Sequence, residues 1–529
     1  MPEGGVVAVI GILDKERTIA PANYNRWLVP PAALAIHLSI GQVYATSVYK
    51  NALVGVFDSS LTTIGLTFSL AIVILGLSAA FLGTWVDTGG PRQAMAAAAV
   101  FWGAGLAVAG IGTATEQIWL LFLGYGVLGG IGLGIGYISP VSTLIKWFPD
   151  RPGLATGLAI MGFGGGALVA SSFESGLLGL FGAENADSAG SGAVAGMFLV
   201  MAAVYFVVML FGAWLVRVPA DDWAPAGFDP EKDKQEKDTG DGGYVTSGSV
   251  SANSAITTRQ FYLVWAVLFC NVTAGIGILE NAQPMIQDFF REGGSSSVSG
   301  SAAVGFVGIL ALANMLGRFV WSSTSDYIGR KNTYMGYLGI GALLFAGIAL
   351  LGTSSTVIFV LFSFIIISFY GGGFATVPAY LRDLFGTFQV GAIHGRLLTA
   401  WAAAGVAGPV IVNGILDASG GEPGSLTADA YRPALFTMVG VLAVGFVANL
   451  LVTRVSDEAH EDEPKGSDRT DVSEHETSGG GTATMTKTET ERDVKTKTPL
   501  LVFSWALVGI PLVYGLITNV IKAAALFTG

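Results

Sequence analysis

The sequence Gly308–Arg330, GILALANMLGRFVWSSTSDYIGR, has the character of a membrane-spanning helix with a charge inside it. It is apolar enough to cross a bilayer, yet Arg318 lies within it and Asn314 precedes Arg318 by one turn. Asp326 marks where the helix leaves the membrane, which places Arg318 roughly 12 Å inside, near the midplane. A guanidinium cannot lose its proton to escape the cost of burial, so we expect Arg318 to bind an anion.

The composition places the whole chain in a membrane. Of 529 residues, 52% are hydrophobic and only 12% are charged, whereas a soluble protein carries about twice that charged fraction. The 74 glycines suit helices packed closely in lipid. A lone cysteine allows neither an intrachain disulfide nor a zinc cluster. With no basic surface for nucleic acid and no metal, nucleotide or catalytic motif, we expect neither an enzyme nor a cofactor.

Runs of about 20 apolar residues predict an all-α integral membrane fold of twelve spans in two six-helix halves, plus one extra C-terminal span. Most of the 27 lysines and arginines fall on cytoplasmic segments if the N-terminus is inside, as expected for a multi-pass protein of the plasma membrane. The expected parts are a cytoplasmic N-terminus (1–27), an N-terminal half (28–216), a disordered cytoplasmic linker (217–258), a C-terminal half (259–453), a charged cytoplasmic tail (454–498) and the extra helix (499–527).

The two halves repeat a loop sequence. The second span ends in GTWVDTGGPR (Gly83–Arg92) and the eighth in SSTSDYIGRK (Ser322–Lys331). Each has an aspartate, a glycine three residues later and then basic residues. The glycine permits a tight turn, and the aspartate can cap a neighbouring helix start and pair with a basic residue. The residues for which we predict this gating and structural role are Gly83, Asp87, Gly90, Arg92, Asp326, Gly329 and Arg330.

This paired loop resembles the signature of the major facilitator superfamily, whose two halves rock about a site at the midplane. Further stretches narrow the resemblance: Asn25-Arg26-Trp27, GQVYATSVY (Gly41–Tyr49), Tyr137-Ile138-Ser139-Pro140, KWFPDRPGLA (Lys146–Ala155) and Asn314-x-x-x-Arg318. Together they are similar to the oxalate:formate antiporter family, whose members move oxalate, formate, lactate, pyruvate and similar small carboxylates. The likeness covers residues 25–453 and leaves the tail and the extra helix outside.

The resemblance implies that Arg318 pairs with a substrate carboxylate and that Tyr44 and Tyr137 line the cavity. The oxalate-handling pattern has a second cation, a lysine in the eleventh span, and Trp401 stands at the position where we expect it. One cation balances one negative charge, so a dianion would be left half-compensated in a low dielectric. We therefore expect a monocarboxylate, with Trp401 as an apolar wall for a short aliphatic tail.

The remaining candidates each have a plainer interpretation beside the functional one. Asn314 can assist Arg318 in binding a carboxylate, although Arg318 could instead form a structural ion pair with a helix carboxylate. Gln42 presents an amide on a helix expected to line the cavity. His37 and Glu280 are candidates for coupling to protons, but His37 could be a packing residue and Glu280 could be solvated at the cavity mouth.

These expectations describe a secondary active transporter of small carboxylate anions that works by alternating access. Proton symport and exchange against a counter-anion both remain open. One rival is a transporter of another anion or of a neutral solute, with Arg318 structural. Another is a membrane sensor or assembly subunit that uses the extra helix to bind a partner of unknown kind.

Overall fold

The structure is a computed structural model, which describes residues 11, 13, 15–21, 24–59, 61–183, 189–220, 223–225, 227, 228, 245, 246, 248–290, 298, 300–419, 426–460 and 498–523. Most of the expected linker and tail, and the side chain of the candidate Glu280, lie outside the described residues.

The described chain forms thirteen helices long and apolar enough to cross a membrane, which confirms the expected fold class. The N-terminal half comprises α2 (Val29–Ile40), η3 (Gly41–Val48), α3 (Lys50–Val56), α4 (Leu61–Gly89), α5 (Pro91–Ala114), α6 (Ile118–Leu121), η4 (Phe122–Leu128), α7 (Gly129–Trp147), α8 (Pro152–Leu180) and α9 (Ser191–Leu215). After α11 (Ala252–Ala255), the C-terminal half comprises α12 (Arg259–Phe289), α13 (Gly300–Ile328), α14 (Arg330–Leu351), α15 (Thr356–Phe385), α16 (Val390–Leu397), α17 (Thr399–Ala418) and α18 (Ala428–Leu450). The extra helix is α19 (Thr498–Ala523).

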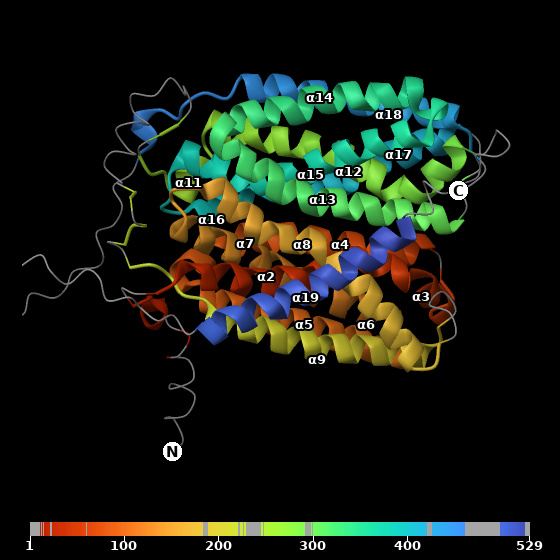
Figure 1. The fold of residues 1–529 in the computed structure, drawn as a ribbon, viewed down its shortest axis with the longest axis horizontal. Helices are drawn as coiled ribbons and strands as arrows, with labels where there is room; N and C mark the ends of the chain where they lie inside the picture. The colour runs from red at the N-terminus through yellow and green to blue at the C-terminus, as the bar shows by residue number, and fades with distance from the viewer. Residues whose placement is uncertain are drawn as a thin grey trace, which may run out of the picture.

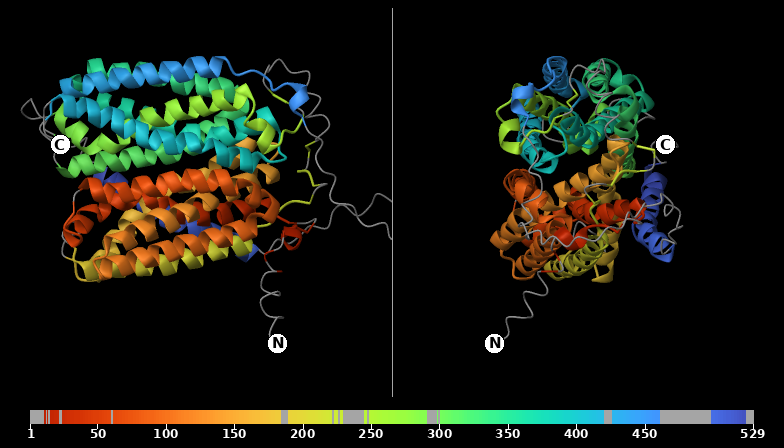
Figure 2. Two further views of the ribbon diagram at one scale, coloured as in Figure 1. Left: turned by 180° about the vertical axis from the view of Figure 1, so that it is seen from behind. Right: turned by 90° about the vertical axis from the view of Figure 1, so that its left-hand side faces the viewer.

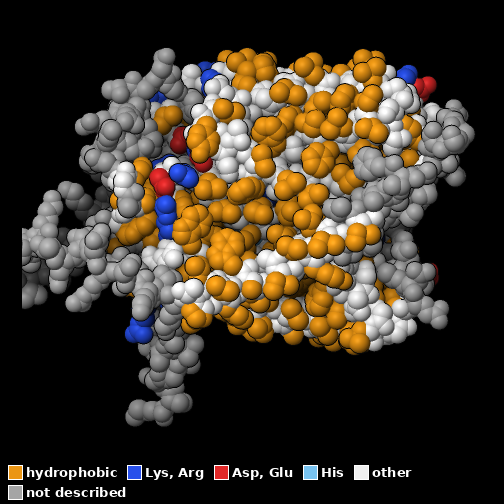
Figure 3. Space-filling view, viewed as in Figure 1, with side chains coloured by type: hydrophobic (Ala, Val, Ile, Leu, Met, Phe, Trp, Pro, Cys, Tyr) orange, Lys and Arg blue, Asp and Glu red, His pale blue; other side chains and the backbone are white. Residues whose placement is uncertain are grey.

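The two halves are separate helix bundles that lie side by side (Figures 1 and 2). Apolar side chains cover the middle of the face in Figure 3, and the charged side chains lie at its two ends. This distribution is the one a bilayer requires, because the hydrocarbon core accepts apolar surface and excludes unpaired charge.

Two seams join the halves: α8 packs against α13, and α4 packs against α16 and α17. Glycines allow the close approach. A Cβ on Gly157 of α8 would lie 2.9 Å from the carbonyl oxygen of Arg318, and one on Gly76 of α4 would lie 2.8 Å from the Cβ of Ala402. Small residues at helix crossings maximise backbone contact in lipid, where apolar burial alone gives little drive to associate.

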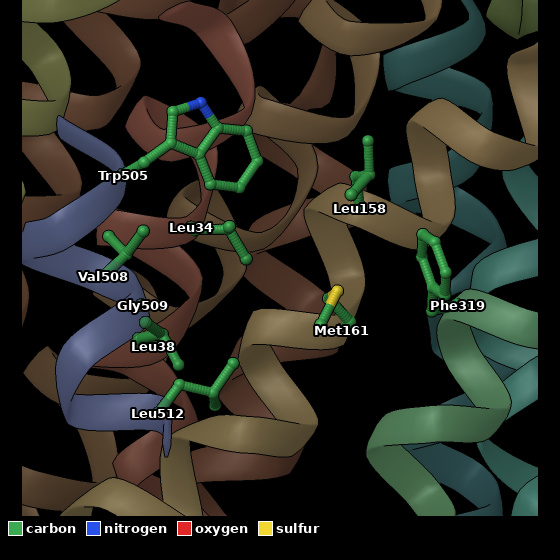
Figure 4. A pocket seen from close by; sticks show the side chains of 9 residues that line it. All are labelled: Leu34, Leu38, Leu158, Met161, Phe319, Trp505, Val508, Gly509 and Leu512. Carbon is green, nitrogen blue, oxygen red and sulfur yellow. The ribbon is translucent and has the colours of Figure 1, made fainter. Parts of the chain in front are cut away.

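The extra helix α19 packs on the outside of the bundle against α2, α8 and α13, and so touches both halves. Its Trp505 indole donates a hydrogen bond to the carbonyl oxygen of Trp27 (3.2 Å), and Phe503 contacts Phe211. Between α19 and the seam lies a cavity of about 210 Å³ with an entirely apolar lining that includes Met161 and Phe319 (Figure 4). The helix therefore covers the α8–α13 seam from the lipid side.

Candidate anion-binding site

Arg318 lies completely buried in α13, at the seam with α8. Its Nε donates a hydrogen bond to Asn314 Oδ1 one turn earlier (3.0 Å), and its Nη1 donates to the carbonyl oxygen of Ile160 on α8 (3.3 Å). Its Nη2 is buried without a hydrogen-bond partner among the described residues. The protein therefore fixes the guanidinium in place and leaves one end of it with donors to offer.

Aromatic rings surround the guanidinium. The rings of Phe163 on α8 and Phe374 on α15 lie 5.5 and 5.2 Å from Arg318 Cζ. Trp401 of α17 contacts both of these rings, and Tyr137 of α7 contacts Phe163 and Trp401. We call Phe163, Phe374, Trp401 and Tyr137 the aromatic cage. Ring faces attract a cation without neutralising it, so the cage orients Arg318 while its positive charge stays available.

Three phenol groups add donors at the same place. The hydroxyls of Tyr44 on η3, Tyr137 and Tyr370 on α15 are buried without a hydrogen-bond partner in the described part of the chain. The hydroxyls of Tyr44 and Tyr137 lie close to the Arg318 guanidinium, and the Tyr370 hydroxyl lies close to that of Tyr44, but none of these pairs has the geometry of a full hydrogen bond. Because buried polar groups are normally paired, donors gathered around one cation are suited to an acceptor that would complete their hydrogen bonds. A carboxylate, with two oxygens and about four lone-pair sites, matches this donor set.

No ion pair found among the described residues includes Arg318. The structural ion pair considered above therefore has no partner in this part of the chain. Arg318 is also the only lysine or arginine in the described helices that lies more than two turns from both helix ends. The site offers one permanent positive charge, and a buried charge without a counter-charge is costly. A single negative charge on a ligand would remove that cost.

The other predicted residues fall into two groups. His37 lies beside the cage, stacked on Tyr137, and its two ring nitrogens face the carbonyl oxygens of Ala159 and Tyr137. A neutral imidazole can donate to only one of these carbonyls, whereas the protonated ring can donate to both. Gln42 lies elsewhere: its amide contacts Glu174 and not Arg318.

The structure adds residues that the sequence did not single out: Phe163, Phe374, Tyr370 and Glu174. The phenylalanines look like ordinary span residues. The sequence could have pointed to Tyr370, because this residue precedes three glycines in the tenth span. These glycines permit close approach, and a Cβ on Gly371 would clash with the backbone and side chain of Asn314. The sequence could also have pointed to Glu174, since it is the only ionisable side chain in α8.

Each loop aspartate caps the first turn of a helix in the other half. Asp326 accepts hydrogen bonds from the backbone N–H groups of Gly153 and Leu154 at the start of α8 (2.8 and 2.9 Å). Asp87 accepts one from Ala392 at the start of α16 (2.8 Å). A carboxylate at a helix N-terminus satisfies free N–H groups and complements the helix dipole. Both caps therefore join the two halves at the same end of the bundle.

The rest of the loop supports these caps. Gly90 and Gly329 adopt φ values of 85° and 83°, a left-handed conformation that a side chain would strain. Arg330 pairs with Asp326 (2.6 Å) and with Asp383 (3.4 Å). In the other loop, Arg92 reaches the carbonyl oxygens of Trp214 and Val216, and a Cβ on Gly83 would lie 2.8 Å from Ala392 Cα.

Comparison with known proteins agrees with the fold. The family model of the Major Facilitator Superfamily matches residues 32–409 and 299–527. The oxalate:formate antiporter of Oxalobacter formigenes is 26% identical over 385 residues, covering 73% of this chain and 83% of the relative. The uncharacterized MFS-type transporter YhjX of Escherichia coli (strain K12) is 23% identical over 71% of this chain and 85% of the relative. The apicoplast pyruvate carrier 1 of Toxoplasma gondii is 25% identical, covering 51% of this chain and 55% of the relative.

Among solved structures, the MFS transporter FucP in the outward conformation is similar, with a TM-score of 0.58 at 14% identity over 82% of this chain and all of FucP. The proton:xylose symporter XylE has a TM-score of 0.54 at 17% identity, covering 80% of this chain and 94% of XylE. At these identities the likeness concerns the fold.

Proposed function

The chain belongs to the Major Facilitator Superfamily, and on that premise we propose that it carries small monocarboxylate anions across the membrane by alternating access, as a secondary transporter without enzymatic activity. The observation that carries this proposal is the buried cation Arg318, with no described carboxylate beside it and with unused donors on Tyr44, Tyr137 and Tyr370 around it. The similarity to an oxalate:formate antiporter and a pyruvate carrier supports the carboxylate class.

In this mechanism the anion completes a site that the protein leaves positively charged. One carboxylate binds the free end of the Arg318 guanidinium and accepts hydrogen bonds from the phenols, while Asn314 holds Nε and keeps the guanidinium oriented. Neutralising the buried charge lowers the cost of closing the site, so occupancy favours the closed state over the empty one. The halves then rock about the α8–α13 and α4–α17 seams, and the two aspartate caps break and reform.

Uptake into proteoliposomes tests the substrate class. The purified protein is assayed with labelled formate, lactate, pyruvate and oxalate, with nitrate and phosphate as other anions and glycerol as a neutral solute. We expect saturable uptake of the monocarboxylates, with oxalate a poorer substrate. Preference for a non-carboxylate anion or for glycerol would overturn the proposal.

We also place the protein in the plasma membrane with its N-terminus in the cytoplasm, which protease accessibility of tagged termini in cells can check.

Trp401 tests the preference for one negative charge. Replacing Trp401 by lysine adds a cation beside the aromatic cage, since the Trp401 ring contacts Phe163 and Phe374, which flank Arg318. We expect Trp401→Lys to shift the ratio of oxalate to lactate transport by about tenfold toward oxalate, because a second cation compensates a second carboxylate. Trp401→Met removes the same ring and adds no charge, so it should weaken transport of both substrates without the shift. An equal ratio in the two variants would contradict this assignment.

Deleting the extra helix tests whether α19 takes part in carboxylate binding or is accessory to it, as the rival role as a sensor or assembly subunit would require. A chain that lacks residues 455–529 loses α19 but keeps every described contact of Arg318. Lipid can replace an apolar helix on the outside of a bundle, so we expect carboxylate binding within about threefold of the full chain. The check is titration calorimetry on the purified truncated protein. Loss of binding in a folded truncated chain would favour a role for α19 in the activity itself.

A further inference from the structure

Glu174 is a second buried ionisable group, on the same helix as part of the aromatic cage. It lies in α8, eleven residues after Phe163, which corresponds to about 16 Å along the helix axis. Its side chain is completely buried, with 0% exposure. No other side chain of α8 can ionise, so the charge state of this helix depends on Glu174 alone.

The contacts of Glu174 are few. Gln42 Nε2 on η3 donates a hydrogen bond to Glu174 Oε1 (2.7 Å), and Oε2 is buried without a partner among the described residues. The Gln42 amide is otherwise engaged: it donates to the hydroxyl of Tyr49 (3.0 Å) and accepts from the hydroxyl of Tyr125 (3.3 Å). Among the described residues the carboxyl group therefore has a single donor, and it has no exposed surface.

The groups that face Glu174 bring no compensating charge. In the described part of the chain, the titratable groups that interact with it electrostatically are Tyr49 before α3, Tyr125 on η4 and Tyr205 on α9, all neutral phenols. Asp326 shows the contrast, since it has two backbone N–H donors and Arg330 as a partner. An ionised carboxylate in the Glu174 environment is strongly disfavoured, whereas a protonated one removes the charge.

We propose that Glu174 is a proton-binding site of this transporter: its carboxyl group holds a proton in the conformation described here and releases it when the N-terminal half opens to water. Water on one side supplies the proton, which forms the O–H bond of Glu174; when the site faces the other side, that bond breaks and water accepts the proton. The coupling of this proton to a carboxylate rests on the function proposed above. It makes the transporter a proton symporter and not an obligate anion exchanger.

The segment η3 connects the two sites. It carries Gln42, which contacts Glu174, and Tyr44, whose ring contacts Phe163 (5.2 Å) and whose hydroxyl lies near Arg318. η3 is a 3₁₀ stretch inside the first span, and Tyr125 lies in a π-helical stretch inside the fourth. Both geometries are often found at functional sites, because they replace the regular hydrogen-bond ladder with one that rearranges more easily. Loss of the proton from Glu174 would change the Gln42 contact and so move the segment that carries Tyr44.

The test compares E174Q with the wild type. Glutamine keeps the shape of a protonated glutamate and cannot release a proton. In proteoliposomes, an inward gradient of one pH unit should drive up to about tenfold accumulation of lactate by the wild type and none above equilibrium by E174Q. Exchange of internal for external lactate should stay within about threefold, which also shows that the variant folds. E116Q, at an exposed carboxyl, is the matched control and should behave as wild type.

Two further measurements separate the alternatives. A pH-dependent infrared difference spectrum should contain a protonated-carboxyl C=O band that disappears in E174Q and persists in E116Q; this readout needs no substrate. If no carboxylate is transported but the band is lost, the proposed function fails and the proton site stands. H37Q tests His37, one of the two candidates that the sequence suggested. Unchanged proton-driven accumulation in E174Q, its loss only in H37Q, or an unchanged band would overturn the proposal.

Discussion

Replacing Arg318 by alanine is expected to reduce carboxylate binding and uptake by at least about 100-fold, equivalent to about 2.7 kcal/mol. Among the described residues, the guanidinium supplies the only permanent positive charge of the site, and its Nη2 has no full hydrogen bond. Without it, a carboxylate would enter a cage of aromatic rings with no counter-charge. The measurements are the Kd for lactate by titration calorimetry and initial uptake rates in proteoliposomes.

Arg318→Lys separates charge from geometry. Lysine keeps the positive charge but lacks the planar guanidinium, whose Nε and Nη1 contact Asn314 and Ile160 while Nη2 is left for a ligand. We expect Arg318→Lys to retain measurable binding, weaker than wild type by about 10-fold. Arg432→Ala is the control, because Arg432 forms an exposed pair with Asp429 and should leave binding unchanged. Normal transport by Arg318→Ala would refute the central role of this residue.

Replacing Asp326 by asparagine is expected to open the end of the bundle that the loops close. Asparagine can accept only one of the two N–H groups at the start of α8, loses the ion pair with Arg330 and places an amide N–H against the other donor. Losing such charge-assisted bonds costs about 1–3 kcal/mol, which shifts the equilibrium between closed and open states by about 5- to 150-fold. The overall uptake rate should fall, because the closed state forms less readily.

Spin labels measure this opening directly. Thr88 and Tyr327 are exposed and lie in the last turns of α4 and α13, in opposite halves, so labels there report the separation of the halves. The lone buried cysteine, Cys270, is replaced first so that only the labels react. We expect Asp326→Asn to populate a longer distance, and Asp87→Asn to add to it, since the two caps lie on different seams. Asp429→Asn should leave the distances as in the wild type, and unchanged distances in Asp326→Asn would contradict the gating role.

The sequence predicted those features that depend on residues near one another in the chain. Apolar runs predict spans because each must cross the hydrocarbon core, and the thirteen helices confirm them. The spacing of Asn314 and Arg318 places both on one helical face, and Asn314 Oδ1 indeed accepts a hydrogen bond from Arg318 Nε. The repeated loop predicted turns at Gly90 and Gly329, and both glycines adopt the positive φ that such turns require.

What only the tertiary structure decided concerns residues far apart in the chain. Hydropathy does not determine which face of one span meets which face of another, so the sequence could not assemble the aromatic cage from α7, α8, α15 and α17. For the same reason the sequence-based expectation for Gln42 was a place in the cavity lining, whereas in the structure its amide contacts Glu174, 132 positions later in the chain. The sequence alone thus determined a thirteen-span protein with a buried arginine. The packing of its helices decided which donors surround that arginine, and which buried carboxyl meets no opposite charge in the described part of the chain.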